Sequence, residues 1–141
     1  MPDATTMERS APVAPIASLA PFVRQKAALL TTYRRDGTPV GTAVNIAVEG
    51  DRAFVRSWDT SGKIKRIRNN PEVEIAPSTM SAKPTGPAIR ARARVLSGAE
   101  SAHAGRLIAR KHPILQGVLV PLYHRLRGLT TAHVELRPVE T

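Results

Sequence analysis

The stretch Arg52-Ala-Phe-Val-Arg-Ser-Trp-Asp-Thr-Ser-Gly-Lys-Ile-Lys-Arg-Ile-Arg-Asn-Asn-Pro71 predicts a strand, a tight loop and a short helix that begins with cations. A helix N-terminus already carries partial positive charge, because its first N–H groups are unpaired. Lys63, Lys65 and Arg66 are therefore unfavourable there in an isolated helix. An anion at the strand-to-helix turn would explain them. The stretch predicts a site for a phosphorylated ligand, with a solvated basic face as the alternative.

Alternating apolar and polar residues on both sides of this stretch predict further strands. Asp36-Gly37 lies between the first two and is typical of a hairpin turn. Hairpin-joined neighbours with helices inserted later favour a mainly β fold, a small closed or partly closed antiparallel barrel. The alternation is not that of a doubly wound parallel sheet. The six predicted strands cover residues 27–33, 40–48, 53–57, 73–76, 89–95 and 131–136.

Four helical segments are predicted from capping and stop residues. Ser18 can cap a short helix, and the helix over 63–70 should end before Pro71, because the residue before proline avoids the helical region. Ser97-Gly98-Ala99-Glu100 matches a capping box and predicts a helix up to His112-Pro113. A last helical piece should follow, kinked near Pro121 and stopped at Gly128.

Length and composition predict one domain. The chain has 141 residues, 42% of them hydrophobic, which is enough for one core. We expect residues 1–16, rich in Ala, Pro and Thr, to be disordered and residues 17–141 to form a single cofactor-binding domain. The absence of cysteine excludes disulfides and thiolate chemistry and fits a reducing cytoplasm. No targeting segment or membrane span is expected, because prolines break the apolar runs.

A net charge of +10 predicts attraction to something negative. Nucleic acid is not the expected partner, because the one Trp, two Tyr and two Phe do not interleave with the basic residues. Arg90, Arg92 and Arg94 are predicted to form the solvent face of a strand whose other face packs on the core. The strongest candidate for an anion site therefore remains the strand–helix stretch.

Candidate catalytic and metal-binding residues are few. The four histidines lack zinc-type spacing and cysteine partners, so we expect no metal site. No Ser/His/Asp arrangement can be argued, and we name no catalytic side chain. Trp58 could stack on a ligand ring or cover a barrel end, and the sequence leaves both open. Tyr123 and His124 are weaker candidates for the substrate pocket.

Several segments together carry a family resemblance. They are Gly37-Thr38-Pro39-Val40, Arg56-Ser57, Ser61-Gly62-Lys63-Ile64-Lys65-Arg66-Ile67-Arg68-Asn69-Asn70-Pro71, Thr85-Gly86-Pro87 and Ala91-Arg92-Ala93-Arg94-Val95-Leu96. In order and spacing they resemble the pyridoxamine-phosphate-oxidase-like split-barrel superfamily, over about residues 18–138. Within it they look most like the branch of oxidoreductases that use the deazaflavin coenzyme F420. The resemblance implies a six-stranded split barrel and a homodimer with the cofactor in a groove at the interface.

The resemblance also implies site residues. In the family the phosphate is bound by the end of the third strand and the start of the next helix, and the second strand lines the ring system. This chain has Gly62 at the position where related FMN enzymes tend to carry an arginine. An FMN phosphate carries nearly two charges and the F420 phosphodiester one, so this difference favours F420. The implied cofactor-binding residues are Val44, Asn45, Arg56, Ser57, Ser61, Gly62, Lys63, Lys65 and Arg66.

The expected function is hydride transfer from reduced F420 to a small organic acceptor. With such a cofactor the protein orients the reactants, and no dedicated acid or base is required. Two alternatives stay open: an FMN-binding split-barrel oxidoreductase, and a non-catalytic flavin- or deazaflavin-binding protein. The identity of the acceptor is not readable from the sequence.

Overall fold

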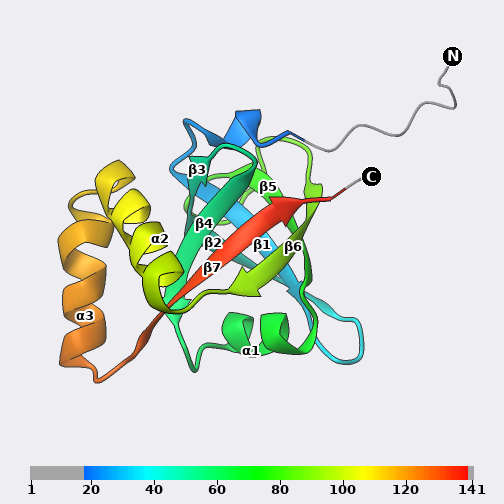
Figure 1. Ribbon diagram of the computed structural model, residues 1–141. Helices are drawn as coiled ribbons and strands as arrows, with labels where there is room; N and C mark the ends of the chain where they lie inside the picture. The colour runs from blue at the N-terminus through cyan, green and yellow to red at the C-terminus, as the bar shows by residue number, and fades with distance from the viewer. Residues whose placement is uncertain (1–17, 140–141) are drawn as a thin grey trace, which may run out of the picture.

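The computed structural model describes residues 18–139 (Figure 1), so the disorder predicted for residues 1–16 lies outside the described residues. The chain forms one curled antiparallel sheet with helices at its ends and on one side. The helices are η2 (Ala20–Phe22), α1 (Gly62–Asn69), α2 (Gly98–Lys111), the π-helix η3 (Leu115–Leu119) and α3 (Val120–Leu126). The strands are β1 (Ala27–Tyr33), β2 (Pro39–Asn45), β3 (Ala47–Glu49), β4 (Arg52–Trp58), β5 (Glu72–Ser78), β6 (Ile89–Val95) and β7 (Thr131–Pro138).

The sheet is closed by one bent segment of chain. The strand order is β2-β1-β5-β6-β7-β4-β3, so the two outermost strands are consecutive in sequence. They meet at Ile46, which is fully buried and belongs to neither strand. Before the bend Asn45 lies opposite Ala27 of β1, and after it Ala47 lies opposite Phe54 of β4. The predicted antiparallel barrel is confirmed. The six-strand count is wrong, because the strand predicted over 40–48 breaks into β2 and β3.

Apolar side chains from both ends plug the barrel. Leu19 and Phe22 belong to the core at one end and Ile64 and Ile67 of α1 at the other, and all are buried. Figure 1 shows η2 and α1 at these opposite ends. Along β6 the alanines face inward and the three arginines outward, as the period of two predicts. The prediction that Arg90, Arg92 and Arg94 face solvent is therefore confirmed.

The helix α2 lies on the outside of the barrel, where Leu96, Ala104 and Ile108 form a second small core with Ala47 and Phe54. Its start at Gly98 follows the prediction, but the Ser97 side chain makes no capping hydrogen bond. The partner expected to complete the capping box, Glu100, instead accepts two hydrogen bonds from Arg94, the shorter at 2.8 Å.

The second helical piece differs from the prediction. Its first part is the π-helix η3, in which the Leu119 N–H donates to the Ile114 carbonyl, five residues back. Pro121 is the second residue of α3, which begins at Val120 directly after η3. The kink expected near Pro121 stays a prediction. Gly128 ends the piece with a φ of 69°, as predicted. None of the helices within residues 18–139 has the length and hydropathy needed to cross a membrane.

A buried carboxylate joins three strands on the outer face of the barrel. Glu135 of β7 has 2% exposure and accepts hydrogen bonds from Arg52, Arg94 and Arg137, the first at 3.1 Å. Burial alone would raise the pKa of Glu135, but the hydrogen bonds from these arginines outweigh it and lower the pKa. The cluster therefore ties β4 and β6 to the last strand.

We expect Glu135→Gln to lower the free energy of unfolding at pH 7 by about 1–3 kcal/mol, because charged hydrogen bonds to three arginines weaken. The cost stays below that of breaking a fully buried ion pair, since these arginine side chains are 28–51% exposed. A carboxyl whose pKa is lowered by folding stabilises the protein above its ordinary pKa of 4.5 and loses that contribution as the pH falls further. Urea titrations between pH 3 and 7 measure both effects.

The matched control is Glu72→Gln, which changes an exposed strand carboxylate that has no ion pair in the described part of the chain. Its stability should stay within about 0.5 kcal/mol of wild type. Equal losses in the two variants would show that the Glu135 cluster does not stabilise the barrel.

Candidate functional site

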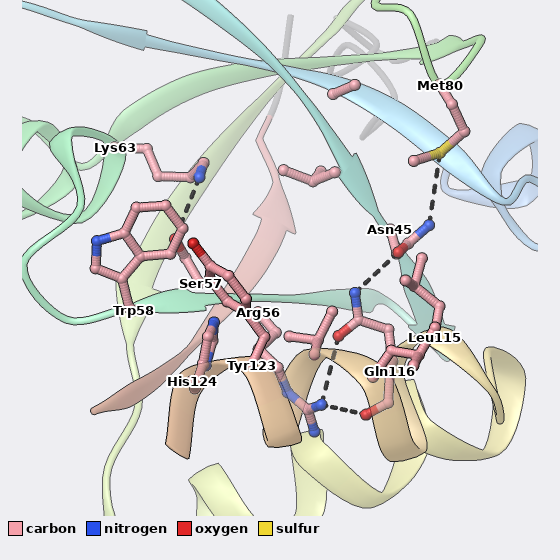
Figure 2. A pocket seen from close by; sticks show the side chains of 14 residues that line it. Asn45, Arg56, Ser57, Trp58, Lys63, Met80, Leu115, Gln116, Tyr123 and His124 are labelled. Atoms are coloured by element: carbon pink, nitrogen blue, oxygen red, sulfur yellow. Dashed lines mark hydrogen bonds between the residues drawn. The ribbon is translucent and has the colours of Figure 1, made fainter. Parts of the chain in front are cut away.

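A cavity of about 530 Å³ lies between the barrel and the helical segment η3–α3 (Figure 2). One wall comes from β2, β4 and the start of α1, and the other from η3 and α3. The volume falls in the range of small-molecule sites. Its lining residues are Ala43, Val44, Asn45, Arg56, Ser57, Trp58, Lys63, Met80, Leu115, Gln116, Leu119, Val120, Tyr123 and His124.

Lys63 is half-buried at one end of the cavity. Its ammonium donates a 3.2 Å hydrogen bond to the Ser57 hydroxyl and lies 5.4 Å from the centre of the Trp58 ring. Within residues 18–139 no carboxylate forms an ion pair with it. Burial and, to a lesser degree, the charge of Arg66 lower the pKa of Lys63. A partly desolvated ammonium without a carboxylate is suited to bind an anion.

Ser57 and Ser61 place this lysine. Ser61 is the N-cap of α1, and its hydroxyl accepts a 3.4 Å hydrogen bond from the Ile64 N–H. The Ser57 hydroxyl donates to the Ser61 hydroxyl at 3.0 Å and accepts from Lys63. The end of β4 and the start of α1 are thus joined by a chain of side-chain hydrogen bonds that ends at the cavity.

Arg56 also lines the cavity, but protein groups surround its guanidinium. It donates to the Gln116 carbonyl, to the Gly105 carbonyl at 3.3 Å and to His133 Nε2 at 3.1 Å. Burial, with Arg56 and His124 nearby, lowers the pKa of His133 to about 4. The neutral His133 ring can therefore accept from Arg56. Arg56 therefore links β4 to α2 and η3 by polar contacts, beside the apolar packing of Phe54 on α2.

A second polar contact holds η3 from the other side of the cavity. The buried Gln116 side chain donates a 2.8 Å hydrogen bond from Nε2 to the side-chain oxygen Oδ1 of Asn45. The Asn45 amide in turn donates to the Lys26 carbonyl at 3.0 Å and to the Met80 sulfur at 3.6 Å. Figure 2 shows the row from Met80 through Asn45 and Gln116 to Arg56. These contacts fix the separation of the two walls.

The structure brings five of the nine predicted cofactor residues to this cavity: Val44, Asn45, Arg56, Ser57 and Lys63. Ser61 lies behind Ser57. The other three, Gly62, Lys65 and Arg66, do not line it. A role in cofactor binding stays a prediction for all nine residues.

Gly62 and Arg66 have a structural relation to each other. A Cβ atom at Gly62 would lie 2.8 Å from a terminal nitrogen of Arg66, so the missing side chain makes room for that guanidinium. Arg66 is turned toward β1, where it donates to the Thr32 hydroxyl at 2.6 Å. Lys65 is exposed to solvent. The space at Gly62 is thus taken by the chain itself.

Several lining residues were not named individually from the sequence, although they fall in the segments 78–88 and 110–128 that we expect to shape the pocket; among them are Met80, Leu115, Gln116 and Leu119. Gln116 could have been singled out, because it is an isolated amide in the apolar stretch 114–123. Of the weaker candidates, Trp58, Tyr123 and His124 all line the cavity. Trp58 meets His124 edge to face, with ring centres 6.1 Å apart.

The residues present fit an aromatic ligand with one anionic group. Apolar side chains and the Trp58 ring supply flat contact surface, and the Lys63 ammonium, held by Ser57, supplies donors at one end. No group of three His, Asp or Glu side chains within residues 18–139 could hold a metal ion. The described histidines instead pair with Glu49, the Ile46 carbonyl, Thr131 and Arg56.

Comparison with known proteins places the fold. No family model and no curated protein matches the sequence. Three solved structures illustrate the structural matches. A proposed pyridoxamine 5'-phosphate oxidase from Listeria innocua is 17% identical, with a TM-score of 0.63 over 86% of this chain and 90% of its own. An F420 reductase is 17% identical, with a TM-score of 0.57 over 89% and 95%. The heme storage protein HutZ from Vibrio cholerae is 14% identical, with a TM-score of 0.66 over 87% and 89%.

These proteins differ in what their names describe, and their sequences share little with this chain. What they have in common with it is the curled antiparallel sheet and its helices. The chain therefore has the fold of the pyridoxamine 5'-phosphate oxidase-like split-barrel superfamily.

Proposed function

We propose that the protein binds coenzyme F420 in the cavity between the barrel and η3–α3 and reduces a small organic acceptor there. The observation that carries the proposal is Lys63, an ammonium in the cavity wall with a hydroxyl partner and no carboxylate within residues 18–139. The F420 reductase among the structural neighbours supports the choice of cofactor.

The charge at the cavity favours a singly charged phosphate. Two cations, Arg56 and Lys63, line it. Arg56 is occupied by two carbonyl oxygens and by His133, which leaves Lys63 to face the ligand. The phosphodiester of F420 carries one negative charge, whereas the phosphate of FMN carries nearly two. One available ammonium matches the diester better.

In this proposal the chain binds and orients and the cofactor carries the redox chemistry. Reduced deazaflavin supplies a hydride when bound. Lys63, positioned by Ser57, would hold the phosphate, and Val44 with Trp58 would contact the ring. The apolar residues Leu115, Leu119 and Val120 would exclude water from the acceptor. The exclusion of water matters, because charges and dipoles in a site interact more strongly without it.

We expect Lys63→Ala to weaken F420 binding by about 1–3 kcal/mol, because a charged hydrogen bond to the phosphate is lost. Isothermal titration calorimetry of wild type and variant with purified F420 measures the difference. Arg68→Ala is the matched control, since it removes an exposed cation of the same helix outside the cavity. Lys65→Ala tests the sequence prediction that Lys65 also binds.

Two results would contradict the proposal. Wild-type protein that gives no binding heat at tens of micromolar F420 would exclude it. Equal losses for Lys63→Ala and Arg68→Ala would indicate a general effect of charge and no contact at Lys63.

Expression in a host that lacks F420 distinguishes an F420-binding protein from an FMN-binding one. A protein selective for F420 should be purified colourless from such a host, because FMN would not be retained. An FMN protein should be yellow, with about one flavin per chain. The absorption spectrum of the purified protein and the flavin released on denaturation measure the outcome, and stoichiometric flavin would overturn the choice of F420.

The proposal includes a homodimer. Exposed large hydrophobic side chains gather on the helical wall: Ile114, Leu115, Val118, Leu119, Leu122, Tyr123 and Leu126 are 39–75% exposed. Leu115, Leu119 and Tyr123 also line the cavity, so the apolar surface is continuous with the proposed site. A second copy of the chain covering this surface would bury it and enclose the ligand.

We expect the protein to sediment at twice the chain mass and Val118→Glu to sediment as a monomer, because a charge would be buried at the interface. Val23→Glu is the matched control: Val23 has 53% exposure against 56% for Val118 but lies beside η2. Sedimentation velocity at low micromolar concentration measures the masses. A monomeric wild type, or dissociation by both variants, would contradict the proposed interface.

A further inference from the structure

His124 lies at the inner side of the cavity with one ring nitrogen unaccounted for. Among the histidines within residues 18–139, His124 alone is both buried, at 4% exposure, and part of the cavity lining. Figure 2 shows it extending from α3 toward Trp58. Its Nδ1 lies 2.9 Å from the Thr131 hydroxyl. Among residues 18–139, Nε2 has no hydrogen-bond partner.

An unpartnered nitrogen in such a place is costly. A buried polar atom that makes no hydrogen bond loses its hydration without replacement, and most such atoms in proteins are satisfied. The rings of Trp58 and Tyr123 have centres 6.1 and 6.3 Å from that of His124 and give at most weak interactions. A ligand atom in the cavity would satisfy Nε2.

Thr131 makes His124 adaptable. A threonine hydroxyl can donate to Nδ1 or accept from it. In the first case Nε2 carries the proton and donates into the cavity, and in the second it accepts. Burial, then the charge of Arg56, lower the pKa of His124, so the ring is neutral near pH 7 and one nitrogen is a donor and the other an acceptor.

We propose that His124 Nε2 hydrogen-bonds a carbonyl oxygen or ring N–H of a planar heteroaromatic ligand, and that Thr131 is the residue that positions its tautomer. This inference rests on the proposed function and deepens it: Lys63 recognises the anionic group, and His124 recognises the ring. The two contacts come from opposite walls, Lys63 from the barrel side and His124 from α3. A ligand with an anionic group but no polar ring atoms would make only the contact with Lys63.

The test is NMR of the full chain labelled with ¹⁵N-histidine, titrated with F420, FMN and lumiflavin, a flavin ring without phosphate. We expect the His124 Nε2 resonance to move on binding while that of His103 does not. His103 is the internal control, because it does not line the cavity and its Nε2 lies 2.9 Å from a carboxylate oxygen of Glu49.

The outcomes separate this inference from the proposed function. F420 binding that leaves His124 Nε2 unmoved overturns the inference and leaves the function standing. Movement with FMN or lumiflavin but no binding of F420 supports the inference and overturns the choice of cofactor. If none of the three compounds binds, both fall.

Two variants test the same contact by affinity. His124→Phe keeps an aromatic ring beside Trp58 and should weaken binding of the ring compounds about tenfold. Thr131→Val keeps the imidazole if His124→Phe does not fold, and should change the ratio of His124 tautomers and weaken binding about threefold. His103→Gln should leave the affinity unchanged. Unchanged affinity in the folded His124 or Thr131 variant would overturn the inference.

Discussion

Arg56 is the contact on which the two-walled cavity depends. Its guanidinium reaches from β4 to carbonyl oxygens of α2 and η3, at Gly105 and Gln116, and to the ring of His133. Guanidinium stays charged even when burial lowers its pKa, so these hydrogen bonds are charge-assisted. The low pKa of His133 keeps that ring an acceptor, and its other nitrogen lies 2.6 Å from the Ser101 hydroxyl. The strands β4 and β7 and the helices α2 and η3 are thus joined by the Arg56 side chain.

The contrast between Arg56 and Lys63 separates a structural cation from a binding one. Both line the same cavity, and both have a pKa lowered by burial. Arg56 is compensated by carbonyl dipoles that belong to the fold. Lys63 has one serine hydroxyl, which satisfies one of its three donors. The number of protein partners therefore indicates which of the two is available to a ligand.

Local sequence patterns predicted much of the barrel. The turn at Asp36-Gly37 is present, with the Asp36 carboxylate accepting from the Thr38 N–H at 3.0 Å and Gly37 at a φ of 88°. The end of α1 before Pro71 and the outward arginines of β6 also follow from short-range rules. The bend at Ile46 was missed, because the period of two continues through it and only the geometry of closure breaks the strand.

The site was harder to predict, because its contacts join distant segments. Asn45 meets Gln116 across 71 positions of sequence and Arg56 meets the same glutamine across 60. A motif around Arg56 shows that a cation stands at the end of a strand. It cannot show that a helix made later in the chain will supply the acceptors. The capping box at Ser97 failed for the same reason, since Arg94 of β6 binds the Glu100 carboxylate with two charged hydrogen bonds and draws it away from the helix start.

The position of β7 between β4 and β6 has a consequence for how the chain is made. The early strands pair with near neighbours, but β4 and β6 both pair with β7, which follows all the other described strands in the sequence. Until residues 131–138 leave the ribosome, both strands present unpaired backbone edges, which are sites of intermolecular association. Premature termination before β7 would therefore release a chain prone to aggregate, even though nearly all of its core residues had already been made.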